Sequence, residues 1–122
     1  MLIAIPVNAQ LIESGVCVSF GRAPYFLIYD TVSGKTSFIA NSAAKEQGGA
    51  GIKAAQIIVD SQVTALLTPR CGENAAKVIS AAKITMYRTL QGSIKDNISA
   101  FEKNQLPLLT QIHSGFHGHN GG

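Results

Sequence analysis

The chain has 122 residues, of which 46% are hydrophobic, so it can bury one core of ordinary size and a second domain is not expected. Ten Lys and Arg residues oppose seven Asp and Glu residues, and the net charge of +3 is scattered along the chain. This pattern argues against nucleic-acid binding and favours an ordinary charged surface. No apolar stretch approaches the roughly 20 residues that cross a bilayer, so no membrane partner is expected.

Two cysteines, Cys17 and Cys71, are too few for a disulfide framework in a chain of this size. The N-terminal sequence MLIAIPVN lacks the basic start and the long apolar core of a signal peptide. We therefore expect a cytoplasmic protein with reduced thiols.

The first half of the chain predicts three strands. Residues 2–7 form a short apolar run that contains Pro6, which suits a buried strand. Residues 25–31 and 36–40 are rich in aromatic and β-branched side chains, and Ser33-Gly34 between them is a hairpin signal. We expect these last two strands to pair antiparallel.

A Gly-rich segment opens the second half and leads into a helix of alternating apolar and polar faces. The glycines are Gly48, Gly49 and Gly51. The apolar side chains that share one face, and that we expect to be buried, are Ile52, Ala55 and Val59.

Strands and helices then alternate. Strand 63–68 precedes helix 73–82, in which Ala75, Ile79 and Ala82 share a stripe, and strand 84–87 precedes helix 94–103. The last helix is expected to begin with a capping box of Ser93 and Asp96 and to bury Ile94, Ile98 and Phe101.

This order of elements predicts an α/β fold. Three strands followed by alternating helices and strands give a mixed five-stranded sheet, with a parallel part and helices on both faces. Beyond Leu108 the apolar pattern ends, so we expect one domain at residues 1–108 and a flexible tail at 109–122.

Cys71 is the first candidate for chemistry. It follows a predicted parallel strand and, with Arg70 and Gly72, opens a helix, where ligands of α/β sheets commonly bind. The helix N-terminus and the arginine are expected to lower the thiol pKa and to favour binding of a soft metal. The alternative is a small buried residue in a tight turn.

The Gly-rich segment is the second candidate. Backbone N–H groups at Gly48, Gly49 and Gly51 can surround an anionic ligand such as a sulfide-bridged cluster. The alternative is that these glycines only make a turn and a close helix contact.

The tail holds all three histidines of the chain, His113, His117 and His119. Imidazoles so close together favour binding of a divalent metal, and the alternative is a solvated end. Nucleophile elbows, metalloprotease helices, C-x-x-C pairs and clustered carboxylates do not occur in the sequence, so no enzyme is expected.

Four segments of the chain together resemble a known family. They are IAIPV near the start, SFGRAPYFLIYD at 19–30, GGAGIKAAQ at 48–56 and TPRCGENAAKV at 68–78. Over residues 1 to about 105 they resemble the dinitrogenase iron-molybdenum cofactor biosynthesis family, the NifX-like domain. The resemblance implies a three-layer ribonuclease-H-like fold and a non-catalytic carrier of an iron-molybdenum or related metal-sulfur cluster.

The resemblance also implies where such a cluster binds and what the protein meets. It adds Ser19 and Arg22 of the signature to the binding candidates already named. Expected partners are a cluster-assembly protein or an Mrp/MinD-type ATPase. Members often carry His where this chain has Ser19 and Gln47, so a different cargo is one alternative. The other is a metal-free interaction module that regulates an Mrp/MinD-type ATPase or a nitrogenase-related partner.

Overall fold

The computed structural model describes residues 1–110. The sheet contains β1 (Leu2–Val7), β2 (Tyr25–Asp30), β3 (Thr36–Ala40), β4 (Ala65–Thr68) and β5 (Thr85–Arg88). The helices are the short 3-10 helix η1 (Ser42–Lys45), α1 (Ala50–Asp60), α2 (Glu73–Ala81) and α3 (Ile94–Glu102). The order of elements predicted from the sequence is thereby confirmed, with η1 as an addition.

The sheet is mixed, as predicted. Its five strands lie in the order β3-β2-β1-β4-β5, with β1 in the centre. β2 pairs antiparallel with both β1 and β3, whereas β4 pairs parallel with β1 and with β5. Gly34 in the β2–β3 turn has a φ of +76°, which explains the glycine of the hairpin signal.

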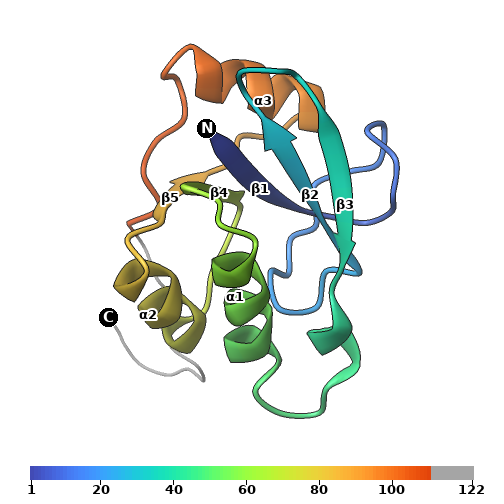
Figure 1. The fold of residues 1–122 in the computed structure, drawn as a ribbon, viewed down its shortest axis with the longest axis vertical. Helices are drawn as coiled ribbons and strands as arrows, with labels where there is room; N and C mark the ends of the chain where they lie inside the picture. Colours follow the sequence, from blue (N-terminus) through green and yellow to red (C-terminus); the bar gives the residue numbers. More distant parts are fainter. Residues whose placement is uncertain (111–122) are drawn as a thin grey trace.

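Helices cover both faces of the sheet (Figure 1). On one face, Ala4, Phe26 and Leu66 pack against α1 and α2. On the other face, inward-facing residues of β1, β2 and β4 pack against Ile94 and Ile98 of α3. Alternate residues of the buried strand β1 therefore serve two cores, which is why its sequence is apolar without interruption.

The helix faces differ in part from the prediction. The fully buried side chains of α1 include Ala54, Ala55 and Ile58, whereas Ile52 is 45% exposed. α1 packs closely on α2, because a Cβ at Gly51 would stand 3.6 Å from the Cβ of Ala75. Small side chains fit such a contact, so the alanines are buried, whereas Val59 is only partly buried against the same core and Ile52 is left exposed.

α2 shows a smaller difference of the same kind. Ala75 and Ile79 are buried as predicted, but Ala76 completes the buried face and Ala82 is the exposed C-cap. The Ser93–Asp96 capping box of α3 is present, and Phe101 is half-buried beside Tyr87 with ring centroids 5.2 Å apart.

The two edges of the sheet differ, because a further segment pairs with β5 but none of the described strands pairs with the outer edge of β3. The segment after α3 runs antiparallel along β5, where the Arg88 N–H donates to the Pro107 carbonyl at 2.8 Å and the Leu109 N–H donates to Met86 at 2.9 Å. Leu109 is only 8% exposed, so the core extends one residue into the segment that the sequence assigns to the tail. Within residues 1–110, no strand pairs with the outer edge of β3.

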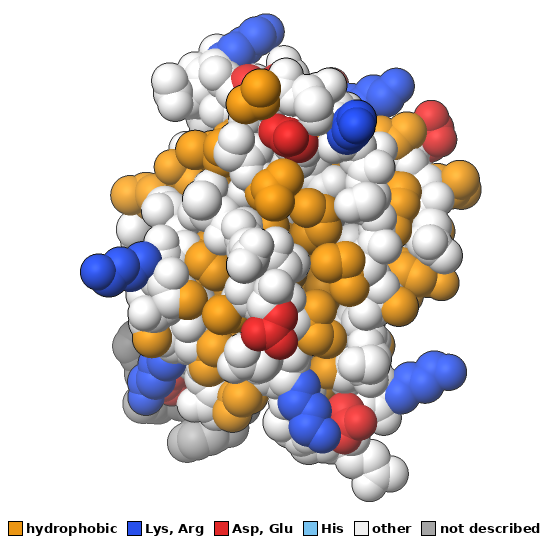
Figure 2. Space-filling model, viewed as in Figure 1, with side chains coloured by type: hydrophobic (Ala, Val, Ile, Leu, Met, Phe, Trp, Pro, Cys, Tyr) orange, Lys and Arg blue, Asp and Glu red, His pale blue; other side chains and the backbone are white. Residues whose placement is uncertain are grey.

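The described helices are short. None of those in residues 1–110 combines the length and the apolar character that crossing a bilayer requires. On the face shown in Figure 2, Lys and Arg side chains lie apart from one another rather than in one patch.

Candidate functional site

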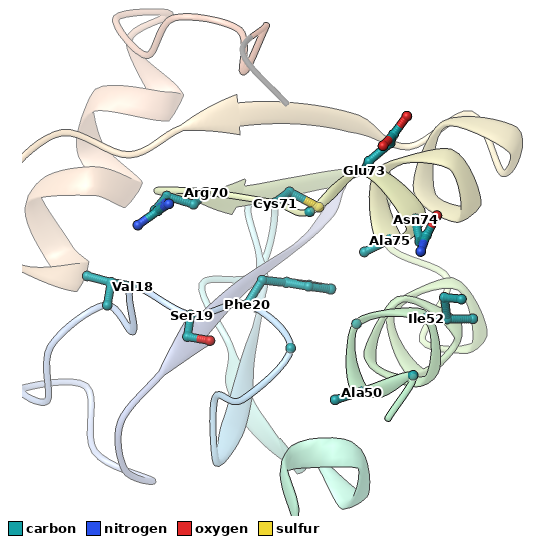
Figure 3. Close-up of a pocket in the computed structure, with 14 residues that line it drawn as sticks. Val18, Ser19, Phe20, Ala50, Ile52, Arg70, Cys71, Glu73, Asn74 and Ala75 are labelled. Atoms are coloured by element: carbon teal, nitrogen blue, oxygen red, sulfur yellow. The ribbon is translucent and has the colours of Figure 1, made fainter. Parts of the chain in front are cut away.

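A cleft of about 520 Å³ lies at the end of the sheet where β1, β3 and β4 finish. Three chain segments line it, namely residues 18–21, 49–52 and 70–75 (Figure 3). The first follows β1, the second opens α1 and the third joins β4 to α2. The Gly-rich turn and the Cys71 loop, the two candidate segments of the sequence analysis, therefore line one cleft.

The wall formed by residues 18–21 rests directly on α1. A Cβ at Gly21 would stand 3.1 Å from both the Cα and the N of Gly51, so this backbone contact needs a glycine. Phe20 anchors the same wall in the core, with its ring centroid 5.4 Å from that of Phe26.

Buried Asn41 fixes this wall from behind. Its Nδ2 donates to the Gly21 carbonyl at 3.2 Å and to the Ala23 carbonyl at 2.8 Å, and its Oδ1 accepts from the Ala43 N–H at 3.1 Å. All three bonds lie at the end of the sheet that carries the cleft. They hold the segment in place before any ligand binds.

Two helices begin at the cleft without a side-chain cap. α1 starts after Gly49, which has a φ of +71°, and α2 starts after Gly72, and neither glycine can supply a capping side chain. Behind the second start, Thr68 Oγ1 donates to the Arg70 carbonyl at 2.9 Å and fixes the loop. Uncapped N–H groups and the positive ends of two helix dipoles make the cleft attractive to anions.

The expected low pKa of Cys71 is wrong. The residue is 1% exposed, and burial raises the pKa of its thiol to about 11. The cause is desolvation by burial, which disfavours the charged thiolate. At neutral pH Cys71 therefore lines the cleft as a neutral thiol, which is closer to the buried-residue alternative than to a ready metal ligand.

Most of the predicted binding residues meet in the cleft. Those that line it are Ser19, Gly49, Gly51, Arg70, Cys71 and Gly72. Gly48 and Arg22 are not among the lining residues. The Arg22 guanidinium instead donates to the carbonyls of Ala44, at 3.0 Å, and of Glu46, just after η1.

The structure adds lining residues that the sequence reasoning missed, of which Asn74 carries the most chemistry. In Figure 3, Asn74 lies beside Ala75 on the side toward Ile52, whereas the carboxylate of Glu73, which also lines the cleft, points the other way. A single asparagine in a helix has no motif, so only its place two residues after Gly72 could have marked it.

No metal site is formed by the described residues. Within residues 1–110, no three His, Cys, Asp or Glu side chains gather closely enough to hold an ion. His113, His117 and His119 lie outside the described residues, so the predicted metal site in the tail stays a prediction.

Comparisons with known proteins show similarity in both sequence and fold. The sequence profile described as dinitrogenase iron-molybdenum cofactor matches residues 1–104. The apo form of the orange protein from Desulfovibrio gigas has 28% identity and a TM-score of 0.84, over 89% of this chain and 92% of that chain. A NifB-like protein from Thermotoga has 34% identity and a TM-score of 0.80, over 98% of each chain.

A dinitrogenase-like protein from Methanocaldococcus jannaschii is more distant. It has 25% identity and a TM-score of 0.67, over 91% of this chain and 96% of that chain. No curated protein sequence matches the chain.

Proposed function

Because the chain belongs to the dinitrogenase iron-molybdenum cofactor family, we propose that it binds and carries an iron-molybdenum or related metal-sulfur cluster without catalysing a reaction. The observation that carries the proposal is the cleft into which two uncapped helices begin. A volume of about 520 Å³ lies in the usual range for small-ligand sites.

The chemistry of the cleft suits an anionic cargo that is bound through hydrogen bonds to its outer atoms rather than through direct coordination of its metals. Backbone N–H groups at the starts of α1 and α2 donate hydrogen bonds to electron-rich sulfide or oxide atoms. Ser19 offers a hydroxyl from the facing wall. The neutral thiol of Cys71 and the lack of a three-ligand group in residues 1–110 fit direct metal coordination less well.

Two broader expectations belong to the same proposal. The strand order β3-β2-β1-β4-β5, with β2 antiparallel to its neighbours, supports placing the fold in the three-layer ribonuclease-H-like class. We also propose a cytoplasmic location, which the two free cysteines support.

Anaerobic reconstitution with iron, sulfide and molybdate, followed by metal analysis and absorption spectra, tests the cargo. We expect Ile52→Glu to retain at least about tenfold less metal than the wild type, since it adds a carboxylate beside the cleft and like charges repel. Val32→Glu is the matched control, because Val32 is 85% exposed in the β2–β3 turn. Equal retention by all three proteins would place the cargo outside the cleft.

The alternative is a metal-free interaction module that regulates an Mrp/MinD-type ATPase or a nitrogenase-related partner. It is favoured by Val18 and Ile52, which line the cleft and are 66% and 45% exposed. Exposed aliphatic side chains often mark contacts between proteins. If reconstitution leaves the wild type without metal while Ile52→Glu abolishes binding to such a partner, this alternative replaces the carrier role.

A further inference from the structure

We propose that two copies of this chain pair through the open edge of β3, about a twofold axis at Phe38, and so join their sheets into one. This inference goes beyond the carrier role and does not depend on it, because β3 contributes no residue to the cleft. The occupant of the edge is a second copy because β3 is complementary to itself in hydrogen bonding and in charge.

The backbone of β3 directs part of its hydrogen-bonding groups away from β2. At the start of the strand, the Lys35 carbonyl accepts from the Asp30 N–H at 3.0 Å. Just after its end, the Asn41 N–H donates to the Pro24 carbonyl at 2.9 Å. Both positions therefore face the β2 side, and in an antiparallel pair the facing positions alternate along the strand. The residues whose N–H and C=O groups face the open edge are Thr36, Phe38 and Ala40.

β3 lacks the features that commonly protect an edge strand. Its five residues include no charged side chain and no proline, and its pairing with β2 runs without a bulge (Figure 1). The loop between β1 and β2 comes near, since Ile12 and Thr36 line one hollow beside α3. No backbone hydrogen bond joins this loop to β3 among the described residues, so the edge stays available to another strand.

A twofold axis at Phe38 gives every outward-facing residue of β3 a partner. Antiparallel pairing then sets Phe38 opposite Phe38 of the second copy and Thr36 opposite Ala40, and the residues of each pair exchange both N–H···O bonds. Aromatic side chains that face each other across two strands add a stabilising contact. Lys35 falls opposite the uncharged Asn41, so no like charges meet along the pair.

The side chains of β3 leave apolar surface for such a partner. Phe38 packs against the core on the α3 side and Ile39 against the core on the other side, yet both are only half-buried. A strand added beside β3 covers more of both side chains, and this burial adds to the hydrogen bonds. Because the two β3 strands run in opposite directions, the two clefts come to lie at opposite ends of the joined sheet.

Hydrogen exchange of the full-length wild type tests the pairing without any substitution. We expect the amides of Thr36, Phe38 and Ala40 to exchange more slowly as protein concentration rises, because the second copy accepts their hydrogens. Ser37 and Ile39 are controls in the same strand, since their N–H groups face β2 at every concentration. Sedimentation reports the dimer in the same samples. A wild type that stays monomeric at about 100 μM, or exchange that does not depend on concentration, would overturn the inference.

An exchange of charges tests which residues face each other. Thr36→Lys combined with Ala40→Lys sets like charges opposite each other at both ends of the pair, and the corresponding double Glu variant does the same. Each is expected to weaken dimerisation about tenfold, whereas a mixture of the two should recover it, because Lys then faces Glu. Thr85→Lys with Ala81→Lys is the matched control, with the same substitutions at exposed positions of β5 and α2.

Thermal melts verify that each variant is folded, and the control should dimerise like the wild type. Wild-type dimerisation of both charged variants would place the contact on another surface and overturn the inference. Variants that remain monomeric when mixed would overturn it as well, because they contradict the pairing of Thr36 with Ala40. The carrier role is judged separately, by metal retention of the wild type after reconstitution, and survives each of these outcomes.

Discussion

The buried thiol of Cys71 makes the stability of the folded protein depend on pH in a predictable direction. Its ordinary pKa is 9.0, and burial raises it to about 11 in the folded protein. Between these values the unfolded chain gives up the proton more readily than the folded one. Deprotonation therefore draws the equilibrium toward the unfolded state.

We accordingly expect the free energy of unfolding to fall as pH rises from about 9 to about 11, with a contribution from Cys71 on the order of 2 kcal/mol. Below pH 9 this group contributes no pH dependence. Urea unfolding of the wild type and of Cys71→Ala at pH 7, 9 and 10.5 isolates the effect, because other groups titrate alike in both proteins. If the free energies of unfolding of the two proteins changed with pH in parallel, the thiol would not be shielded from water.

Asn41 is the buried polar residue most closely tied to the cleft wall. Asn41→Ala removes its three hydrogen bonds and leaves buried carbonyls unpaired, so we expect a loss of about 2 kcal/mol in stability. Asn8→Ala is the control, since the exposed Asn8 makes one 3.2 Å bond to the Gly15 carbonyl. Chemical denaturation checks both, and equal small losses would mean that water replaces Asn41 readily.

Among the secondary-structure elements, α3 is the one whose stability depends most clearly on its N-terminal cap. The Ser93 Oγ accepts from the Asp96 N–H at 2.9 Å, and α3 alone covers one face of the sheet among the described helices. Ser93→Ala should therefore lower stability by about 1 kcal/mol. Ser80→Ala, at an exposed position inside α2, should be neutral or slightly stabilising. Thermal melts of the two variants decide this, and similar melting temperatures would argue against a role for the cap.

The elements also show where sequence reasoning succeeds. Strand and hairpin positions follow from local signals, and residues 2–7 and 36–40 were bounded correctly as β1 and β3. Helix faces depend on what each helix packs against, so the burial of Ile52 was predicted wrongly. Ala55 is buried as the pattern predicted, but alanine carries too little hydrophobic signal for the pattern to place Ala54 on the buried face as well.

The site was predictable only to the level of loops. Parallel strands bring the segments after β3 and β4 to one end of the sheet, so the meeting of Gly49 with Cys71 followed from chain order. The pKa of Cys71 depends on burial by distant segments, which the sequence of its own loop does not contain. The Arg22 guanidinium donates to the Ala44 carbonyl in η1, and the sequence pattern did not predict this element.

For the whole molecule, the end of the core is tested best by paired truncations. A chain ending at residue 110 keeps Leu109 and its bond to Met86, and we expect it to fold like the full-length protein. A chain ending at residue 108 loses this buried leucine and should be about 2 kcal/mol less stable. Equal denaturation midpoints would show that Leu109 adds nothing to the core.

The same 110-residue chain tests the predicted tail metal site. If His113, His117 and His119 hold a divalent ion, zinc binding should be present in the full-length protein and absent after truncation. It should weaken as pH falls through about 6.5, because protons compete for the imidazole nitrogens. Isothermal titration with zinc provides the measurement. Equal zinc binding by both chains would show that the zinc binds within residues 1–110 and not at the three histidines.

The unequal edges of the sheet limit how copies of this chain could polymerise. Residues 107–109 occupy the outer side of β5, so among the described strands only β3 presents unpaired backbone groups. A unit with two open edges can extend into a ribbon without limit. A unit with one can join a second copy edge to edge about a twofold axis, and growth then stops. Strand pairing through β3 would thus be self-terminating, and a fibre built this way would first require the segment on β5 to detach.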